Sequence, residues 1–180
     1  YCKQKTRIVI AGSHGKTTIT SMILHVLKKC DINFDYLVGA NIEGFENMVS
    51  LSDENEFVVI EGDEYYSSAI DSKSKFFWYK PNITLISGID WDHINIFPTI
   101  ESYINQFKQY VDSICKGGIV VYYENDLELK SELKINELNT IYGKSNEYSD
   151  LELKKRIKAL LWFRERLDIL ELNPKSLRDP

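Results

Sequence analysis

The chain has 180 residues, of which 43% are hydrophobic and 12% aromatic, enough for one α/β domain with a substantial core and a short appendage. A formal net charge of −5 gives no general electrostatic attraction for nucleic acid, and no apolar run is long enough to cross a membrane. The 3 cysteines are widely spaced, which suggests reduced thiols in a cytoplasmic protein and argues against a disulfide framework or a zinc site.

The first predicted elements are a strand, a glycine turn and a helix. Residues 7–11 form an apolar run typical of a buried strand, and residues 19–27 carry apolar side chains at helical spacing. A glycine turn between them can point backbone N–H groups at an anion, and the helix N-terminus adds further donors and a positive dipole end. The segment therefore predicts a phosphate-binding loop made of Gly12, Ser13, His14, Gly15, Lys16, Thr17 and Thr18.

Two residues of this loop carry the predicted chemistry. Lys16 supplies a positive charge for the outer phosphates of a nucleotide, and the Thr17 hydroxyl can ligate Mg²⁺. The spacing is unusual, because Gly12 and Gly15 are closer together than the glycines of the common G-x-x-x-x-G-K pattern. A plain glycine turn is the alternative interpretation.

Later apolar runs predict the remaining strands of one sheet. Residues 57–60 form a continuous apolar run, which suits a strand covered on both faces, as in a parallel sheet. Residues 83–88 repeat this design, and residues 118–123 predict another buried strand. Shorter strands are predicted at 36–39 and 140–142. With the helices between them, these strands predict an α/β fold of the P-loop NTPase type, with a mostly parallel sheet and helices on both faces.

Two helical segments are predicted in the second half of the chain. The first covers residues 99–116, with Thr99 as its N-cap and Gly117 as its stop. The second is a basic amphipathic tail at 151–180, which follows an ATP-binding domain predicted at 1–150. We expect the tail to pack on its own domain. Packing on a neighbouring domain or subunit is the alternative, and membrane-surface binding is not favoured without a second anchor.

Acidic residues and a histidine follow the predicted strands. Glu61 closes the run at 57–60, and a carboxylate there is costly unless it is paired or bound to a metal such as Mg²⁺. A solvated turn is the alternative, and Asp63 and Glu64 either share the role or are bystanders. His93 suits a metal or phosphate role, or a hydrogen-bonded turn. Because ligands of open α/β sheets bind at the carboxyl ends of the strands, we expect these segments to meet.

Together these motifs resemble the central ATPase domain of the ATP-dependent Mur ligases over roughly residues 5–125. The matching segments are AGSHGKTT at 11–18, EGDE at 61–64 and DH at 92–93, and the short glycine spacing is that family's form. Within the family, residues 60–81 look most like the murein-recycling ligases, which join UDP-N-acetylmuramate to L-alanyl-γ-D-glutamyl-meso-diaminopimelate. The ligases that add L-alanine to UDP-N-acetylmuramate are similar but fit this stretch less well.

The resemblance implies an amide-forming ligase of peptidoglycan synthesis or recycling that uses ATP and Mg²⁺ and works through an acyl phosphate. By similarity, the loop amides bind ATP, and Lys16, Glu61 and His93 are catalytic. Thr17, Glu61 and His93 would hold Mg²⁺. Several relatives support a second metal with a carbamylated lysine, and Lys108 lies at the matching spacing after His93. A solvated lysine on a helix face is the alternative.

The resemblance also implies two domains that this chain does not contain, one for the UDP-sugar and one for the peptide. Since the chain starts at Tyr1 and not at methionine, we expect it to belong to a longer protein. Alone, it should bind nucleotide weakly and ligate nothing. Two other functions stay open. One is a nucleotide-binding module without catalysis. The other is a folate or cyanophycin polymer synthetase, against which the segment at 73–76 argues by resemblance.

Overall fold

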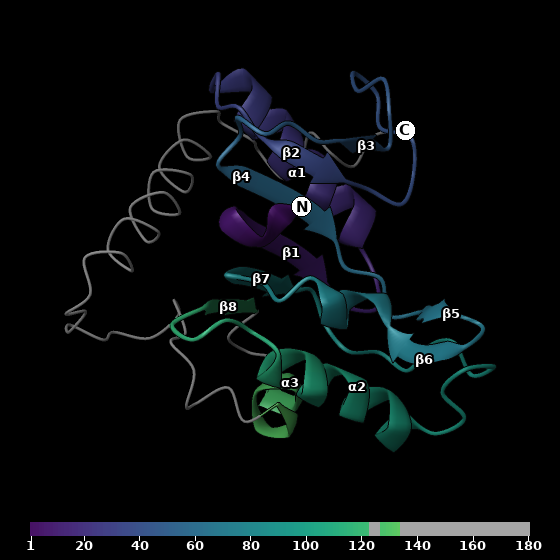
Figure 1. Ribbon diagram of the computed structural model, residues 1–180. Coiled ribbons are helices and arrows are strands. Elements are labelled where there is room, and N and C mark those ends of the chain that lie inside the picture. Colours follow the sequence, from purple (N-terminus) through teal and green to yellow (C-terminus); the bar gives the residue numbers. More distant parts are fainter. Residues whose placement is uncertain (123–126, 134–180) are drawn as a thin grey trace, which may run out of the picture. The chain divides into compact units, whose positions relative to one another are not determined.

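The computed structural model describes residues 1–122 and 127–133, which form layers of helix, sheet and helix (Figure 1). A six-stranded sheet has the order β3-β2-β4-β1-β7-β8, and every neighbouring pair is parallel except β2 with β3. Its strands are β1 (Thr6–Ala11), β2 (Asp35–Leu37), β3 (Val49–Ser50), β4 (Phe57–Glu61), β7 (Ile83–Ile86) and β8 (Ile119–Tyr122).

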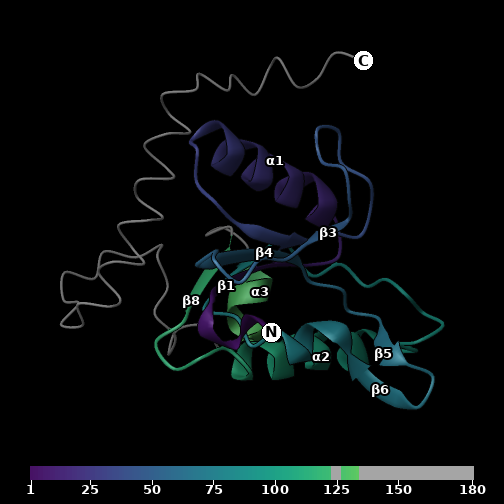
Figure 2. The same ribbon diagram turned by 45° about the horizontal axis from the view of Figure 1, so that its top comes forward.

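Helices cover both faces of the sheet, with α1 on one face and α2 and α3 on the other (Figure 2). This arrangement confirms the predicted fold class. None of the helices in the described part of the chain has the length and apolar character needed to span a membrane. The elements outside the sheet are the helices α1 (Lys16–Lys29), α2 (Ile100–Asp112) and α3 (Leu127–Glu132), the 3₁₀ turns Cys2–Gln4 and Lys75–Trp78, and the hairpin of β5 (Tyr66–Ser68) with β6 (Asp71–Ser74).

Strand β1 lies at the centre of the sheet, paired with β4 on one side and β7 on the other. Its last three residues, Val9, Ile10 and Ala11, are completely buried, as expected of a strand covered on both faces. The chain passes from β1 through α1 to β2 on one side, and from β7 through α2 to β8 on the other. The strand order therefore reverses beside β1, and open α/β sheets bind ligands at the carboxyl ends of the strands at such a point.

An aromatic cluster holds α2 against the sheet. Tyr103, Phe107 and Tyr110 recur at helical spacing on its inner face, and all three are completely buried. The Phe76 ring lies 4.4 Å from the Tyr110 ring, centroid to centroid, and the Tyr110 hydroxyl is 2.6 Å from Thr84 Oγ1. Burial of the phenol raises the pKa of Tyr110, so this hydroxyl stays protonated. Burial of each such ring contributes about 1.5–3 kcal/mol to the stability of the fold, so α2 is held firmly against the sheet and fixes the position of the loop before it.

The main helix of the second half begins as predicted but ends early. Thr99 caps α2, forming a reciprocal capping box with the first turn. The helix ends at Asp112 and not at residue 116, because the Cys115 N–H leaves the helical pattern and donates to the Pro81 carbonyl at 3.0 Å. Gly117, the predicted stop, lies beyond the helix in a turn with φ 75°, so that prediction is wrong.

Three other differences concern short segments. The strand predicted at 36–39 is β2, which starts and ends earlier than expected. Strand β3 and the β5–β6 hairpin were not predicted. The strand predicted at 140–142 and the helical tail predicted at 151–180 lie outside the described residues.

Candidate functional site

The loop between β1 and α1 depends on two glycines with left-handed backbone torsions. The φ angle is 120° at Gly12 and 77° at Gly15. At Gly12 a Cβ atom would lie 2.3 Å from Ser87 Oγ, so only glycine fits between the loop and the end of β7. Ser87 Oγ also donates to the carbonyl of the exposed His14 at 2.6 Å.

The first turn of α1 offers donors to an anion. Gly15 is the N-cap, and no side chain in the described part of the chain caps this helix. The N–H groups of Lys16, Thr17 and Thr18 therefore stand at the positive end of the helix dipole without a partner inside the helix. This is the arrangement that binds phosphate or carboxylate groups at helix N-termini.

Ser13, predicted as a phosphate contact, is instead turned into the protein. Its N–H donates to the Gly88 carbonyl at 3.0 Å, and its Oγ accepts from the Asp90 N–H at 2.8 Å. The same Oγ lies 2.8 Å from the Tyr103 hydroxyl. Burial raises the pKa of Tyr103, which keeps the phenol protonated and able to share a hydrogen. Ser13 therefore braces the loop against α2 and the segment after β7.

Lys16 is folded back onto its own loop. Its Nζ donates to the carbonyls of Gly12 at 2.7 Å and Ser13 at 3.3 Å, and to Glu64 Oε1 at 3.0 Å. The same Oε1 lies 2.9 Å from Nε2 of His93, so one carboxylate joins the loop lysine to the histidine. Glu64 is only 1% exposed, and a buried carboxylate is tolerated when it is paired in this way. The structure thus brings Lys16 and His93 to one place.

Glu61 lies beside the first turn of α1. Its Oε1 accepts from Thr17 Oγ1 at 2.7 Å, and its Oε2 accepts from the Gly39 N–H at 3.1 Å. Hydroxyl and carboxylate oxygens suit Mg²⁺, which usually takes one or two carboxylates and completes its shell with phosphates and water. The Thr17–Glu61 pair fits such an ion. Within residues 1–122 and 127–133, no three His, Cys, Asp or Glu side chains gather into a metal cluster.

Asp63 and Glu64 are neighbours in sequence but lie in opposite environments. The Asp63 side chain is 37% exposed and pairs with Lys75 at 2.6 Å, whereas Glu64 is buried at the loop. The partners of Glu64 lie 48 and 29 positions away in the sequence. No local pattern separates the two acids, so the sequence alone does not indicate that Glu64 is the buried partner of Lys16 and His93.

His93 sits in a tight turn after β7. Its φ angle is 58°, its N–H donates to Asp92 Oδ1 at 2.7 Å, and its carbonyl accepts two N–H groups from the following turn. The Tyr65 ring lies 4.3 Å from the imidazole, centroid to centroid. With Nε2 held by Glu64, the ring is fixed from two sides, and its Nδ1 lies 3.7 Å from Asp92 Oδ1.

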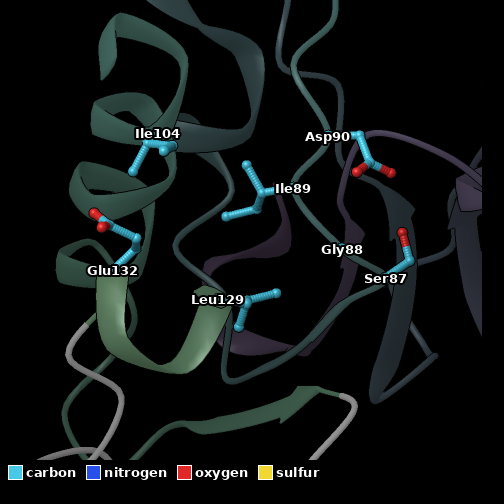
Figure 3. A pocket seen from close by; sticks show the side chains of 7 residues that line it. All are labelled: Ser87, Gly88, Ile89, Asp90, Ile104, Leu129 and Glu132. Atoms are coloured by element: carbon cyan, nitrogen blue, oxygen red, sulfur yellow. The ribbon is translucent and has the colours of Figure 1, made fainter. Parts of the chain in front are cut away.

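A cavity of about 190 Å³ opens beside the loop brace, between the segment after β7 and the helices α2 and α3 (Figure 3). Ile104 of α2 and Leu129 and Glu132 of α3 form one wall. Glu132 pairs with Lys108 at 2.9 Å, and both side chains are 42% exposed. This contact is one that an unmodified lysine on a helix face can form, and carbamylation of Lys108 stays a prediction of the resemblance.

Comparisons with known proteins agree with the motifs. A family model described as the Mur ligase middle domain matches residues 10–171. The UDP-N-acetylmuramate–L-alanyl-γ-D-glutamyl-meso-2,6-diaminoheptandioate ligase of Escherichia coli K12 is 32% identical over 126 residues, 70% of this chain and 27% of that protein. A UDP-N-acetylmuramate–L-alanine ligase of Clostridium botulinum is 36% identical over 140 residues, 77% of this chain and 29% of that protein.

Among solved structures, the UDP-N-acetylmuramate:L-alanyl-γ-D-glutamyl-meso-diaminopimelate ligase of Neisseria meningitidis has a TM-score of 0.65 and 28% identity. The match covers 73% of this chain and 43% of that one. This chain spans between 24% and 30% of the length of the curated relatives it matches.

Proposed function

Because the chain belongs to the Mur ligase family, through its middle domain, we propose that it is the ATP-binding domain of an amide-forming ligase of peptidoglycan synthesis or recycling. The proposed whole enzyme joins UDP-N-acetylmuramate to L-alanyl-γ-D-glutamyl-meso-diaminopimelate. One observation carries the proposal. At the ends of neighbouring strands, an uncapped helix N-terminus and Lys16 lie beside the hydrogen-bonded pair of Thr17 and Glu61.

These residues would divide the work of binding a triphosphate. The N–H groups of the first turn of α1 and the Lys16 ammonium bind the β- and γ-phosphates. Thr17 and Glu61 hold Mg²⁺, which supplies neutralising charge when bound. Ser13 contributes indirectly, because its N–H and Oγ contact Gly88, Asp90 and Tyr103 and so brace the loop. Phosphoryl transfer depends mainly on positioning and electrostatic stabilisation, and fixed donors of this kind provide both.

The chemistry has two steps. A muramate carboxylate oxygen attacks the γ-phosphorus of ATP, ADP leaves, and an acyl phosphate forms. The peptide amine then attacks the acyl carbon, and the tetrahedral adduct loses phosphate to give the amide. We place His93 at the transferred phosphoryl group, because it stands next to Lys16 across Glu64 and its ring is held by Tyr65. There it would help a carboxylate approach a phosphate of like charge.

The proposal also names the acceptor that receives the activated muramate group. Residues 60–81, which include the β5–β6 hairpin, favour the tripeptide acceptor by resemblance. L-alanine is the second candidate, because the Clostridium relative that uses it is 36% identical to this chain.

Nucleotide binding by this chain tests the domain assignment. We expect it to bind MgATP in a calorimetric titration, and we expect Lys16→Ala to weaken binding by at least about tenfold, since a charge-assisted contact is worth about 1.5–3 kcal/mol. Lys29→Ala, at an exposed position in the last turn of the same helix, is the matched control and should leave the affinity unchanged. An unchanged affinity in Lys16→Ala would contradict the loop assignment.

Ligation requires the longer protein with its UDP-sugar and peptide domains. Phosphate release from ATP and UDP-N-acetylmuramate should depend on the tripeptide, and release that depends on L-alanine instead would support the second candidate. ATP binding with no acyl phosphate formed would point to a nucleotide-binding module without catalysis. The isolated chain should ligate neither acceptor.

A further inference from the structure

Glu64 presents a buried negative charge to the loop that is expected to bind phosphates. Its Oε1 accepts from Lys16 Nζ at 3.0 Å and lies 2.9 Å from His93 Nε2. Its Oε2 lies 2.9 Å from Lys16 Nζ, yet it accepts no aligned hydrogen bond from any described residue. One oxygen of a carboxylate that is 1% exposed is thus left partly satisfied, which is costly for a buried charged group.

Lys16 has no donor to spare in this arrangement. An ammonium group has three N–H donors, and those of Lys16 are directed at the carbonyls of Gly12 and Ser13 and at Glu64. A phosphate that enters the loop must therefore displace or share one of these contacts. Glu64 is the anionic partner of the three, so it competes with phosphate for the lysine. Its charge also repels phosphate, and burial weakens the screening of that repulsion.

We propose that Glu64 is a positioning residue that holds Lys16 before nucleotide binds and selects for nucleotide accompanied by a divalent cation. This inference rests on the ATP site proposed above. Before nucleotide binds, the Glu64 carboxylate takes the position at Lys16 that a phosphate would take, and it keeps Lys16 next to His93. When phosphates bind Lys16, Glu64 loses that partner and keeps only the contact with His93. The negative charge of Glu64 then disfavours a nucleotide that carries no divalent cation.

Removal of the charge at this one position tests the proposal. Glu64→Gln keeps the shape and an oxygen that can accept from His93. We expect it to bind ADP in EDTA about tenfold more tightly than the unchanged chain, equivalent to about 1.4 kcal/mol, with a clearly smaller gain in excess Mg²⁺. Asp63→Asn removes the same charge from the neighbouring exposed position, where it pairs with Lys75, and should change the affinity less than about twofold.

The outcomes of these titrations separate the role of Glu64 from the existence of the ATP site. A folded Glu64→Gln variant with unchanged or weaker ADP affinity overturns the role of Glu64, as does an equal gain in Asp63→Asn. If Glu64→Gln does not fold, Glu64→Asp replaces it, because the shorter side chain moves the negative charge away from Lys16. This variant must bind ADP in EDTA more tightly than the unchanged chain, by a smaller factor than expected for Glu64→Gln, and an unchanged affinity overturns the proposal. If neither the unchanged chain nor Glu64→Gln binds ADP with or without Mg²⁺, the ATP site itself is wrong and the inference falls with it. Binding by the unchanged chain with no gain in Glu64→Gln removes only the inference.

Discussion

Gly12→Ala is a substitution whose effect follows directly from the loop geometry. The added methyl group would lie 2.3 Å from Ser87 Oγ, 2.8 Å from Ser87 N and 3.0 Å from the Gly88 carbonyl oxygen. The hydroxyl can rotate away, but the two backbone atoms can move only with the end of β7. An L-residue at φ 120° costs about 1–2 kcal/mol, and overpacking costs about 1–3 kcal/mol. We therefore expect the free energy of unfolding to fall by about 2–5 kcal/mol.

Gly44→Ala is the matched control for this substitution. Its φ angle is 83°, yet a Cβ atom there would meet nothing within 4 Å, so only the torsional cost of about 1–2 kcal/mol should remain. Urea unfolding followed by far-UV circular dichroism measures the loss of unfolding free energy in both variants. The difference between the two losses gives the cost of the steric clash between the loop and the end of β7. Only Gly12→Ala should also weaken MgATP binding. Equal losses of stability in the two variants would refute the close approach of the loop to β7.

Two further substitutions test the supports of the fold and the loop. Lys5→Met removes the ammonium that lies 2.6 Å from the buried Asp35 carboxylate, and we expect the free energy of unfolding in urea to fall by about 3–5 kcal/mol. Adding Asp35→Asn should recover part of this loss, and no recovery would count against the ion pair. Ser13→Ala removes the acceptor of the Asp90 N–H and the partner of the Tyr103 hydroxyl, so we expect the free energy of unfolding to fall by about 1–3 kcal/mol. ATP binding should also weaken, and an unchanged affinity would show that these contacts of Ser13 do not shape the loop.

The main strands and the loop could be predicted because local sequence determines them. A strand buried on both faces favours an unbroken apolar run, and β4 has one at residues 57–60 and β8 at Ile119–Tyr122. A tight turn between a strand and a helix needs glycine where the φ angle is positive, as at Gly12 and Gly15. The β5–β6 hairpin escaped prediction because its strands, Tyr66–Ser68 and Asp71–Ser74, are short and mostly polar, with no apolar run to mark them.

The roles within the site could not be predicted, because they depend on partners far away in the chain. Ser13 belongs to the loop in sequence, yet Tyr103, 90 positions later, takes its hydroxyl. Asp63 and Glu64 differ in burial and in the side chain each meets, since one pairs with Lys75 at the surface and the other is buried against Lys16. Composition and spacing can place several acids near a site, but only packing decides which of them is buried against the charge.

Gly62 accounts for how one short segment brings two carboxylates to the loop. In the parallel register Glu61 pairs with Ile10, and the next N–H, that of Gly62, donates to the Ile10 carbonyl at 2.7 Å. A Cβ atom on Gly62 would lie 2.9 Å from Val9 Cγ1 and 3.0 Å from that carbonyl oxygen, so the chain can cross the end of β1 this closely only at glycine. The crossing carries Glu64 to the loop lysine while Glu61 stays beside the first turn of α1. Both carboxylate contacts therefore depend on the same close approach of β4 to β1.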